Sequence, residues 1–245
     1  MKVCKFGGSS VADAAQIKKV KEIIESDRQR VYVVPSAPGK RFEGDTKVTD
    51  MLYAYHAAVS RGESGDEIFE EIRQRFIDIR DGLGVSTDIE SHLDKIAADV
   101  QAGACEDYTV SRGEYLNGLL LADYLGFDFI DPAGVIFFNA NGVYESEKTR
   151  TVMRGRLRQS RTAVIPGFYG SMPDGTIKTF SRGGSDITGA IVARAAKADV
   201  YENWTDVPGV MMADPRIVEN PRVISKITYR ELRELSYMGA TVLHE

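Results

Sequence analysis

Short runs of β-branched and aromatic residues end in turns rich in glycine and polar side chains, and patterns typical of amphipathic helices follow them. The first turn, at 7–10, separates the run 1–6 from a helical pattern over 12–25. Comparable turns follow the runs 176–180 and 200–204. This alternation predicts an α/β domain in which helices cover a largely parallel sheet. The turns fall at the carboxyl ends of strands, where open α/β sheets bind ligands.

Length and composition suit one compact domain. The chain has 245 residues, of which 43% are hydrophobic and 27% charged, and its formal net charge is -5. This acidic balance argues against binding to nucleic acid or to an anionic membrane. Apolar stretches such as 119–122 fall far short of the roughly 20 residues of a membrane helix, and residues 1–5 lead into no signal peptide. We therefore expect a soluble, cytoplasmic protein with no nucleic-acid or membrane partner.

The remaining elements follow from periodicity and turn residues. Cys4 and Cys105 lack the spacing of a metal site or a disulfide scaffold, so we assign no metal ligand to the protein. The run 40–47 is polar, and we expect an exposed loop there. Further strands are expected at 30–34, 127–130, 135–138 and 163–165, and further helices at 48–59, in a helical insertion at about 65–105, from 107 onwards, at 187–196 and at 229–235.

The turn after the first strand joins Lys5 to the paired glycines Gly7 and Gly8. Glycines let a backbone approach an anion closely, and the following helix offers free N–H groups and a positive dipole end. A plain strand-to-helix turn with a surface lysine has the same pattern. The motif alone therefore leaves both interpretations open.

The turn at 181–186 combines Arg182 with two glycines, Ser185 and Asp186. The planar guanidinium of arginine suits a carboxylate or a phosphate, and a plain turn has no need of it. Ser185 and Asp186 also fit the roles of helix cap and N-terminal helix charge. The third turn, at 204–209, is by itself an ordinary turn set by proline and glycine.

Familiar nucleotide signatures are missing in their usual forms. A Walker A loop ending at Gly39 needs Gly at 34 and Ser or Thr at 41, where the chain has Val34 and Arg41. The Gly-x-Gly at 82–84 lacks the third glycine of a Rossmann turn, because Thr87 stands there. These mismatches exclude a P-loop protein and argue against a nicotinamide enzyme.

Five motifs follow one another along the chain, and a resemblance rests on all of them together. They are Lys5-Phe6-Gly7-Gly8-Ser9-Ser10-Val11, Ser181-Arg182-Gly183-Gly184-Ser185-Asp186, Trp204-Thr205-Asp206-Val207-Pro208-Gly209-Val210, Asp214-Pro215-Arg216 and Met238-Gly239-Ala240-Thr241-Val242-Leu243-His244. In order and spacing, along nearly the whole chain, they resemble the aspartate kinases of the amino acid kinase family. One such motif is weak evidence, whereas five in sequence are highly specific.

The resemblance implies a three-layer α/β/α sandwich with ATP and L-aspartate across the carboxyl edge of the sheet. It implies transfer of the γ-phosphoryl group of ATP to the side-chain carboxylate of L-aspartate, giving 4-phospho-L-aspartate and ADP, the first step towards lysine, methionine and threonine. Such transfer needs mainly positioning and charge neutralisation. Lys5 and Asp186 are the implied catalytic residues. Gly7, Gly8 and Ser9, with Lys5, would bind the phosphates.

On the substrate side, the resemblance pairs Arg182 with the α-carboxylate of aspartate and Glu114 with its α-ammonium. From the residues alone, Glu114 is better interpreted as a solvated helix residue. The other matched substrate positions are Ser36, Thr49, Phe168, Gly183 and Ser185.

The nucleotide side matches Thr205, Asp206, Met211 and Arg216. Mg²⁺ is implied with ATP, with nucleotide oxygens and water as most of its ligands. The chain departs from the family pattern in the longer segment 40–47, which affects the alignment of Thr49. It also departs at Met211, where many relatives have Tyr, and at Thr241, where many have Lys.

Aspartate kinases of this kind continue past the position of Glu245 into a last catalytic segment and paired ACT domains that bind lysine or threonine. We accordingly expect one catalytic domain over 1–245 without amino-acid feedback inhibition, and the resemblance allows a homodimer. Two alternatives stay open. One is a relative acting on glutamate, N-acetylglutamate, carbamate or a nucleoside monophosphate, against which Arg182 and Glu114 favour a free α-amino acid. The other is a regulatory relative that binds nucleotide or amino acid without turnover.

Overall fold

The computed structural model describes residues 1–181, 183–205, 209, 211–213 and 217–237. The chain divides into two compact units, Met1–Trp204 and Thr205–Glu245. The two units are described separately. The expectation of a single domain over 1–245 stays a prediction.

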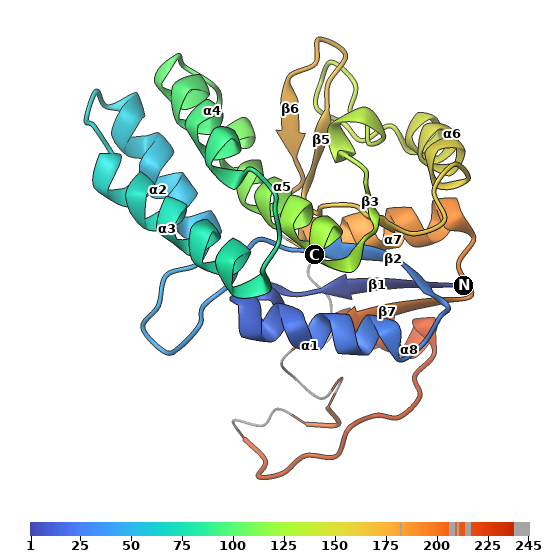
Figure 1. The fold of residues 1–245 in the computed structure, drawn as a ribbon. Helices are drawn as coiled ribbons and strands as arrows, with labels where there is room; N and C mark the ends of the chain where they lie inside the picture. The colour runs from blue at the N-terminus through green and yellow to red at the C-terminus, as the bar shows by residue number, and fades with distance from the viewer. Residues whose placement is uncertain (182, 206–208, 210, 214–216, 238–245) are drawn as a thin grey trace. The chain divides into compact units, whose positions relative to one another are not determined.

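The first unit is built on a five-stranded sheet in the order β3-β4-β2-β1-β7, in which every pairing is parallel (Figure 1). Strand β1 therefore lies between β2 and β7, and its register places Lys5 beside Val34 on one neighbour and Asn203 on the other. The carboxyl ends of these strands meet at one edge of the sheet. The strands are β1 (Lys2–Phe6), β2 (Arg30–Pro35), β3 (Asp128–Phe129), β4 (Ala163–Val164) and β7 (Val200–Trp204).

Helices cover both faces of this sheet. Successive side chains of a strand point to opposite faces, so Cys4 and Phe6 of β1 join one hydrophobic cluster and Val3 joins another. This arrangement confirms the three-layer α/β/α architecture. The first cluster draws on α1 (Ala14–Glu25), α2 (Val48–Ser60), α3 (Asp66–Leu83), α4 (Ile89–Gln101) and α5 (Glu106–Leu125), and the second on α6 (Ser146–Leu157) and α7 (Gly184–Ala196).

Local sequence signals account for the ends of several helices. The side chain of Asp13 accepts a hydrogen bond from the Gln16 N–H at 2.8 Å and caps α1, and Asp88 caps α4 through the Ser91 N–H. Gly84 and Gly126 end α3 and α5 in the left-handed conformation that glycine adopts readily. Two helices, α3 and α4, occupy the insertion expected at about 65–105.

Some expected elements differ from the structure. The segment 135–138 is not a strand. Its N–H at Phe137 is taken by the Thr149 hydroxyl at 2.9 Å, and only isolated bridges join Phe137 to Ser171 and Phe138 to Tyr144. The strand expected at 176–180 is β6 (Ile177–Thr179), which pairs antiparallel with β5 (Tyr169–Ser171) outside the main sheet. The turn at 7–10 contains a short 3-10 helix, η1 (Gly8–Val11), and a second, η2 (Pro132–Gly134), precedes the segment 135–138.

The second unit contains the helix α8 (Tyr229–Tyr237). Thr228 and Glu231 cap it reciprocally: the Thr228 N–H donates to Glu231 Oε2 at 2.8 Å, and the Glu231 N–H donates to Thr228 Oγ1 at 3.3 Å. Before this helix, an isolated bridge joins Met211 to Val223. Across the described part of the whole chain, no helix combines the length and the apolar character needed to cross a membrane.

Candidate active site

A lysine and a carboxylate form an ion pair at the carboxyl end of the central strand. Lys5 Nζ lies 2.9 Å from Oδ1 of Asp186, in the first turn of α7. Lys5 is only 8% exposed, and it points to the α7 face because its neighbours Cys4 and Phe6 point to the other. The amide of Asn203 donates to the same oxygen of Asp186 at 3.0 Å. The fold therefore brings together the two residues predicted to be catalytic.

The glycine turn lies directly beside this pair. A Cβ atom on Gly7 would lie 3.8 Å from Lys5 Nζ, so the lysine ammonium borders the turn. Gly8 packs backbone to backbone on Gly39: a Cβ on Gly39 would lie 2.6 Å from the carbonyl carbon of Gly8, and the Gly39 N–H donates to Gly8 O at 2.9 Å. Gly7, Gly8 and Ser9 are half-buried. Only glycine at 39 permits this approach of two loops.

The start of α7 packs against a strained residue. Phe168 has φ 84°, a left-handed conformation that is unusual for a bulky side chain. Its N–H donates to Thr188 Oγ1 at 3.1 Å, and its carbonyl accepts from the Phe180 N–H at 2.8 Å. A Cβ on Gly184 would lie 2.6 Å from the Phe168 ring, and one on Gly167 would lie 2.5 Å from Ser185 Oγ. Phe168, Gly183 and Ser185 thus surround one helix N-terminus.

The segment after β2 connects these parts. The Ser36 N–H donates to Phe6 O at 3.1 Å, and the Gly167 N–H donates to Pro35 O at 3.0 Å. The Val48 N–H donates to Pro38 O at 3.1 Å, which holds the start of α2 and Thr49 against the same segment. Residues from β1, β2, α2 and the approach to α7 therefore meet at the carboxyl edge of the sheet.

Glu114 is enclosed by the protein, contrary to the interpretation as a solvated helix residue. It is 5% exposed, because α5 is covered on most of its circumference. Burial raises the pKa of Glu114 to about 8, although a backbone hydrogen bond from Ala37 opposes the rise. Its Oε2 has no hydrogen-bond partner among the described residues. A buried carboxylate without a cation is suited to receive a positively charged ligand group.

Several predicted residues cannot be placed with this cluster. Arg182, Asp206 and Arg216 lie outside the described residues. Thr205 and Met211 belong to the second unit, so their part in nucleotide binding stays a prediction. In the described part of the chain, no group of three or more His, Cys, Asp or Glu side chains is placed to hold a metal ion.

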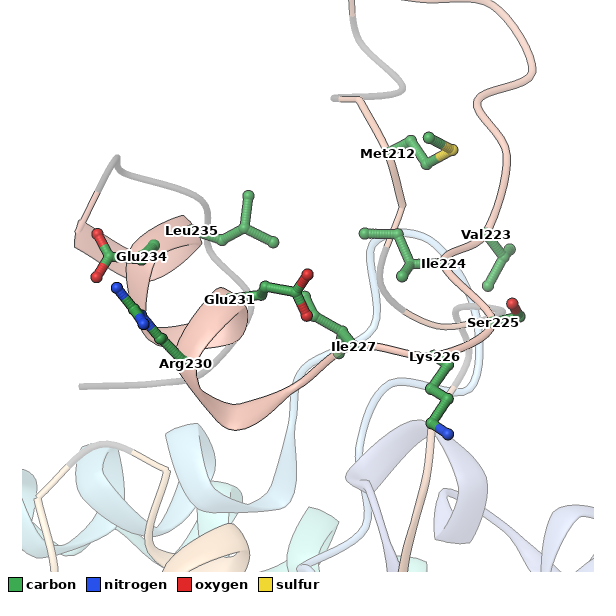
Figure 2. A pocket seen from close by; sticks show the side chains of 10 residues that line it. All are labelled: Met212, Val223, Ile224, Ser225, Lys226, Ile227, Arg230, Glu231, Glu234 and Leu235. Carbon is green, nitrogen blue, oxygen red and sulfur yellow. The ribbon is translucent and has the colours of Figure 1, made fainter.

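A cavity of about 590 Å³ opens within the second unit. Figure 2 shows Leu235 and Glu231 on its α8 side and Met212, Val223 and Ile224 on the preceding segment. None of Lys5, Gly8 and Asp186 lines this cavity. Its lining is largely apolar.

Comparison with known proteins identifies the family. The sequence model described as the amino acid kinase family matches residues 1–245. The chain belongs to the amino acid kinase family. Aspartokinase 3 of Bacillus subtilis (strain 168) is 40% identical to this amino acid kinase over 263 residues, which cover 100% of the chain and 57% of the relative.

Aspartate kinases are among the solved structures similar to this amino acid kinase. The Clostridium acetobutylicum enzyme is 55% identical with a TM-score of 0.94, over 100% of this chain and 56% of that one. E. coli aspartokinase III, solved in complex with aspartate and ADP, is 30% identical with a TM-score of 0.84, over 100% of this chain and 57% of that one. The chain thus spans little more than half the length of these relatives.

Sequence reasoning missed three polar residues of this amino acid kinase that contact the cluster. Asn203 touches Asp186, Asn117 donates to Ser36 O at 2.7 Å, and Arg75 donates to Gly39 O at 3.1 Å. Each acts across a long sequence separation. The polar character of Asn203 inside a strand was the only local signal, and nothing local marked Asn117 or Arg75 on their helices.

Proposed function

We propose that this chain is the catalytic part of an aspartate kinase, which transfers the γ-phosphoryl group of MgATP to the side-chain carboxylate of L-aspartate. The observation that carries the proposal is the Lys5–Asp186 ion pair beside the Gly7–Gly8 turn and the N-terminus of α7. A buried cation that borders a glycine turn on one side and the first turn of a helix on the other suits a transferring phosphoryl group. The aspartate and ADP bound by the E. coli relative support the same assignment.

The reaction needs little covalent work from the protein. The aspartate carboxylate is ionised at neutral pH, so it attacks the γ-phosphorus without a general base. The new P–O bond forms as the bond to the β-phosphate oxygen breaks, and ADP leaves with that electron pair. In this proposal Lys5 neutralises charge on the transferring oxygens, and Gly8 and Ser9 donate to the phosphates. The Gly7 N–H donates to Trp204 O at 3.1 Å, so Gly7 contributes by letting the backbone approach the phosphates closely. Asp186 and Asn203 hold the Lys5 ammonium in place.

Aspartate is held by its two ends in this proposal. Arg182 binds the α-carboxylate, and Glu114, which has no cation beside its Oε2 among the described residues, receives the α-ammonium. The remaining substrate contacts come from Ser36, Thr49, Phe168, Gly183 and Ser185. An acceptor without a free α-ammonium would offer Glu114 no positive group to bind, which disfavours N-acetylglutamate and carbamate.

The nucleotide is assigned to Thr205, Asp206, Met211 and Arg216. Mg²⁺ fits this chain as part of MgATP: Asp186 is already engaged by Lys5 and Asn203, and the described residues offer no cage of acidic ligands. Phosphate oxygens and water would then be its ligands, as is usual for this ion.

The reaction is tested by ADP release from MgATP across a panel of acceptors, with hydroxylamine present to trap an acyl phosphate as its hydroxamate. We expect hydroxamate with L-aspartate, and none with glutamate or N-acetylglutamate. Binding of ATP by calorimetry without turnover on any acceptor would replace the proposal with a nucleotide-binding regulatory role.

A pair of lysine variants tests the site. Lys5→Ala removes a preorganised cation and should lower kcat about 10²–10³-fold. Lys18→Ala, an exposed lysine on α1, should leave kcat unchanged. Equal activity of the two variants would show that Lys5 does not act on the phosphoryl group.

A further inference from the structure

One peptide bond beside the proposed aspartate site is held at both of its polar groups by α5. The Ser36 carbonyl accepts a hydrogen bond from Asn117 Nδ2 at 2.7 Å. The N–H of the same peptide unit, on Ala37, faces the Glu114 carboxyl group and lowers its pKa. Residues three apart on a helix lie on one face, so Glu114 and Asn117 bind the Ser36–Ala37 peptide together.

The packing around this peptide brings α5 close to it. A Cβ on Gly113 would lie 2.9 Å from Ala37 Cβ, so glycine at 113 lets α5 approach the segment closely. On the opposite side, the Ser36 N–H donates to Phe6 O. The segment is therefore fixed between the end of β1 and one face of α5.

Asparagine at position 117 would destabilise the fold if its side chain only filled space. It is 0% exposed, and its Oδ1 has no hydrogen-bond partner among the described residues. A buried amide oxygen without a partner destabilises a fold, whereas leucine has the same branching and no polar atom to satisfy. The contribution of Asn117 lies in its Nδ2 donor, which the Ser36 carbonyl receives.

We propose that Asn117 is a positioning residue for aspartate binding: it fixes the orientation of the Ser36–Ala37 peptide, and with it the place of Ser36 and of the Glu114 carboxylate. The inference rests on the proposed function. Without the Asn117 donor, the Ser36 carbonyl is free to turn away from α5, and the Ala37 N–H turns away from Glu114 with it. The Gly7–Ser9 turn of the ATP side borders the same segment through the Ala37 carbonyl, from which a Cβ on Gly8 would lie 3.1 Å. That carbonyl belongs to the next peptide unit, so the larger effect of losing the Asn117 donor is expected on aspartate.

The test compares Asn117→Leu with Ser160→Ala. Ser160 also has a buried oxygen without a partner among the described residues, in the connection from α6 to β4, so its variant is a matched control for removing such an atom. For Asn117→Leu we expect the KM for aspartate to rise tenfold or more, with kcat and the KM for ATP within about twofold of wild type. For Ser160→Ala we expect no change in any of the three.

Asn117→Ser keeps a shorter donor, and it should give an aspartate KM between those of wild type and Asn117→Leu. This variant carries the test if the leucine variant does not fold. Amide hydrogen exchange at Ala37 reads the peptide directly, without turnover, and should be faster in either Asn117 variant than in wild type or Ser160→Ala.

The outcomes separate the two proposals. Aspartate turnover by the wild type, together with an unchanged aspartate KM and unchanged Ala37 exchange in the Asn117 variants, overturns the role of Asn117 and leaves the proposed function standing. A fall in kcat together with comparable rises in the KM for aspartate and the KM for ATP would show that Asn117 has a merely structural role. That result would likewise overturn the positioning role of Asn117. A wild type that neither binds nor phosphorylates aspartate overturns the proposed function first, and the inference with it.

Discussion

Glu114 shows how its surroundings set the chemistry of one side chain. Its burial raises its pKa to about 8, so the carboxyl group holds its proton at pH 7 in the structure as it stands. The charge of Arg112, on the same helix, lowers the pKa but does not offset the burial. A positive ligand group beside Glu114 would favour the ionised form and drive the proton off.

Aspartate binding is therefore expected to release a proton from Glu114. At pH 7 we expect nearly one proton per aspartate bound, falling towards none at pH 9, where the group is already ionised. Calorimetry in two buffers of different ionisation enthalpy measures this number. Glu114→Gln should release none, whereas Glu67→Gln, at an exposed position on α3, should behave as wild type. Equal binding enthalpies in both buffers would contradict the assignment of Glu114 to the ammonium group.

Among the secondary-structure elements, α3 binds the loop 40–47, which was predicted from the sequence to be exposed. Most of 40–47 is exposed, but Asp45 is not: both its carboxylate oxygens accept from Arg75 Nη2, at 2.8 and 3.0 Å. Arg75 is 4% exposed and also donates to Gly39 O. A hydrogen bond from Arg41, with the charge of Arg75 nearby, holds the pKa of Asp45 well below its usual range. Through Gly39, this helix supports the glycine turn.

Asp45→Asn should destabilise the fold by about 3 kcal/mol, because it leaves the Arg75 guanidinium buried without a carboxylate. It should also raise the KM for ATP, since Gly39 packs on Gly8. Arg41→Gln removes the more exposed partner of the same carboxylate and should cost less than about 1 kcal/mol. Urea unfolding measures the loss of unfolding free energy in both variants. Equal losses would show that the buried Arg75 contact stabilises the fold no more than the exposed Arg41 contact does.

A second polar cluster joins three strands of the main sheet. Burial would raise the pKa of Glu202 on β7, but hydrogen bonds from Arg30, Lys2 and Trp204 outweigh it and hold the pKa at about 2. These donors come from β2, β1 and β7 itself, so the carboxylate links the three strands. Its folded-state pKa lies below the ordinary value of 4.5, so its stabilisation is present above that pH and is lost as pH falls towards 2.

Glu202→Gln should lower the free energy of unfolding at pH 7 by about 1.5–3 kcal/mol, the usual worth of hydrogen bonds to a charged group. The difference from wild type should shrink below pH 4.5 and vanish near pH 2. Denaturation curves at pH 7, 5 and 3 follow it. A difference that stays constant over this range would mean that the charge of Glu202 is unimportant.

For the whole molecule, the distribution of apolar burial matters most. Both hydrophobic clusters, including their partly buried members, consist of residues from 3 to 204. The first unit therefore contains a complete core of its own, on both faces of the sheet. The residues assigned to the nucleotide, from Thr205 onwards, lie in the second unit.

A chain ending at Trp204 is accordingly expected to fold, with a single cooperative thermal transition within a few degrees of that of the complete chain. It should bind ATP at least tenfold more weakly, because Thr205, Asp206, Met211 and Arg216 are removed. Circular dichroism and calorimetry measure the two properties. A broad, non-cooperative transition would show that the second unit is needed for the core, and undiminished ATP affinity would move the nucleotide site elsewhere.

Much of the fold and part of the candidate site could be predicted from local patterns. Periodicity predicted β1, β2 and β7 and most of the helices, and the resemblance drew attention to Lys5, Asp186 and the turn glycines. The strand predicted at 135–138 was wrong. The segment alternates as a strand does, but the N–H of Phe137 donates to the side-chain hydroxyl of Thr149. The antiparallel pair β5–β6 was missed because partner choice depends on contacts that periodicity does not encode.

Local sequence establishes which groups this chain can offer: a lysine and glycines after one strand, a carboxylate at a helix start, and apolar faces that must be covered. These are local properties, carried by neighbouring residues. The packing of the elements establishes that Glu114 is buried, that Asn203 touches Asp186, and that Asn117 and Arg75 hold the loops beside the glycine turn. Burial and long-range hydrogen bonds depend on which elements pack together, and no local pattern contains that information.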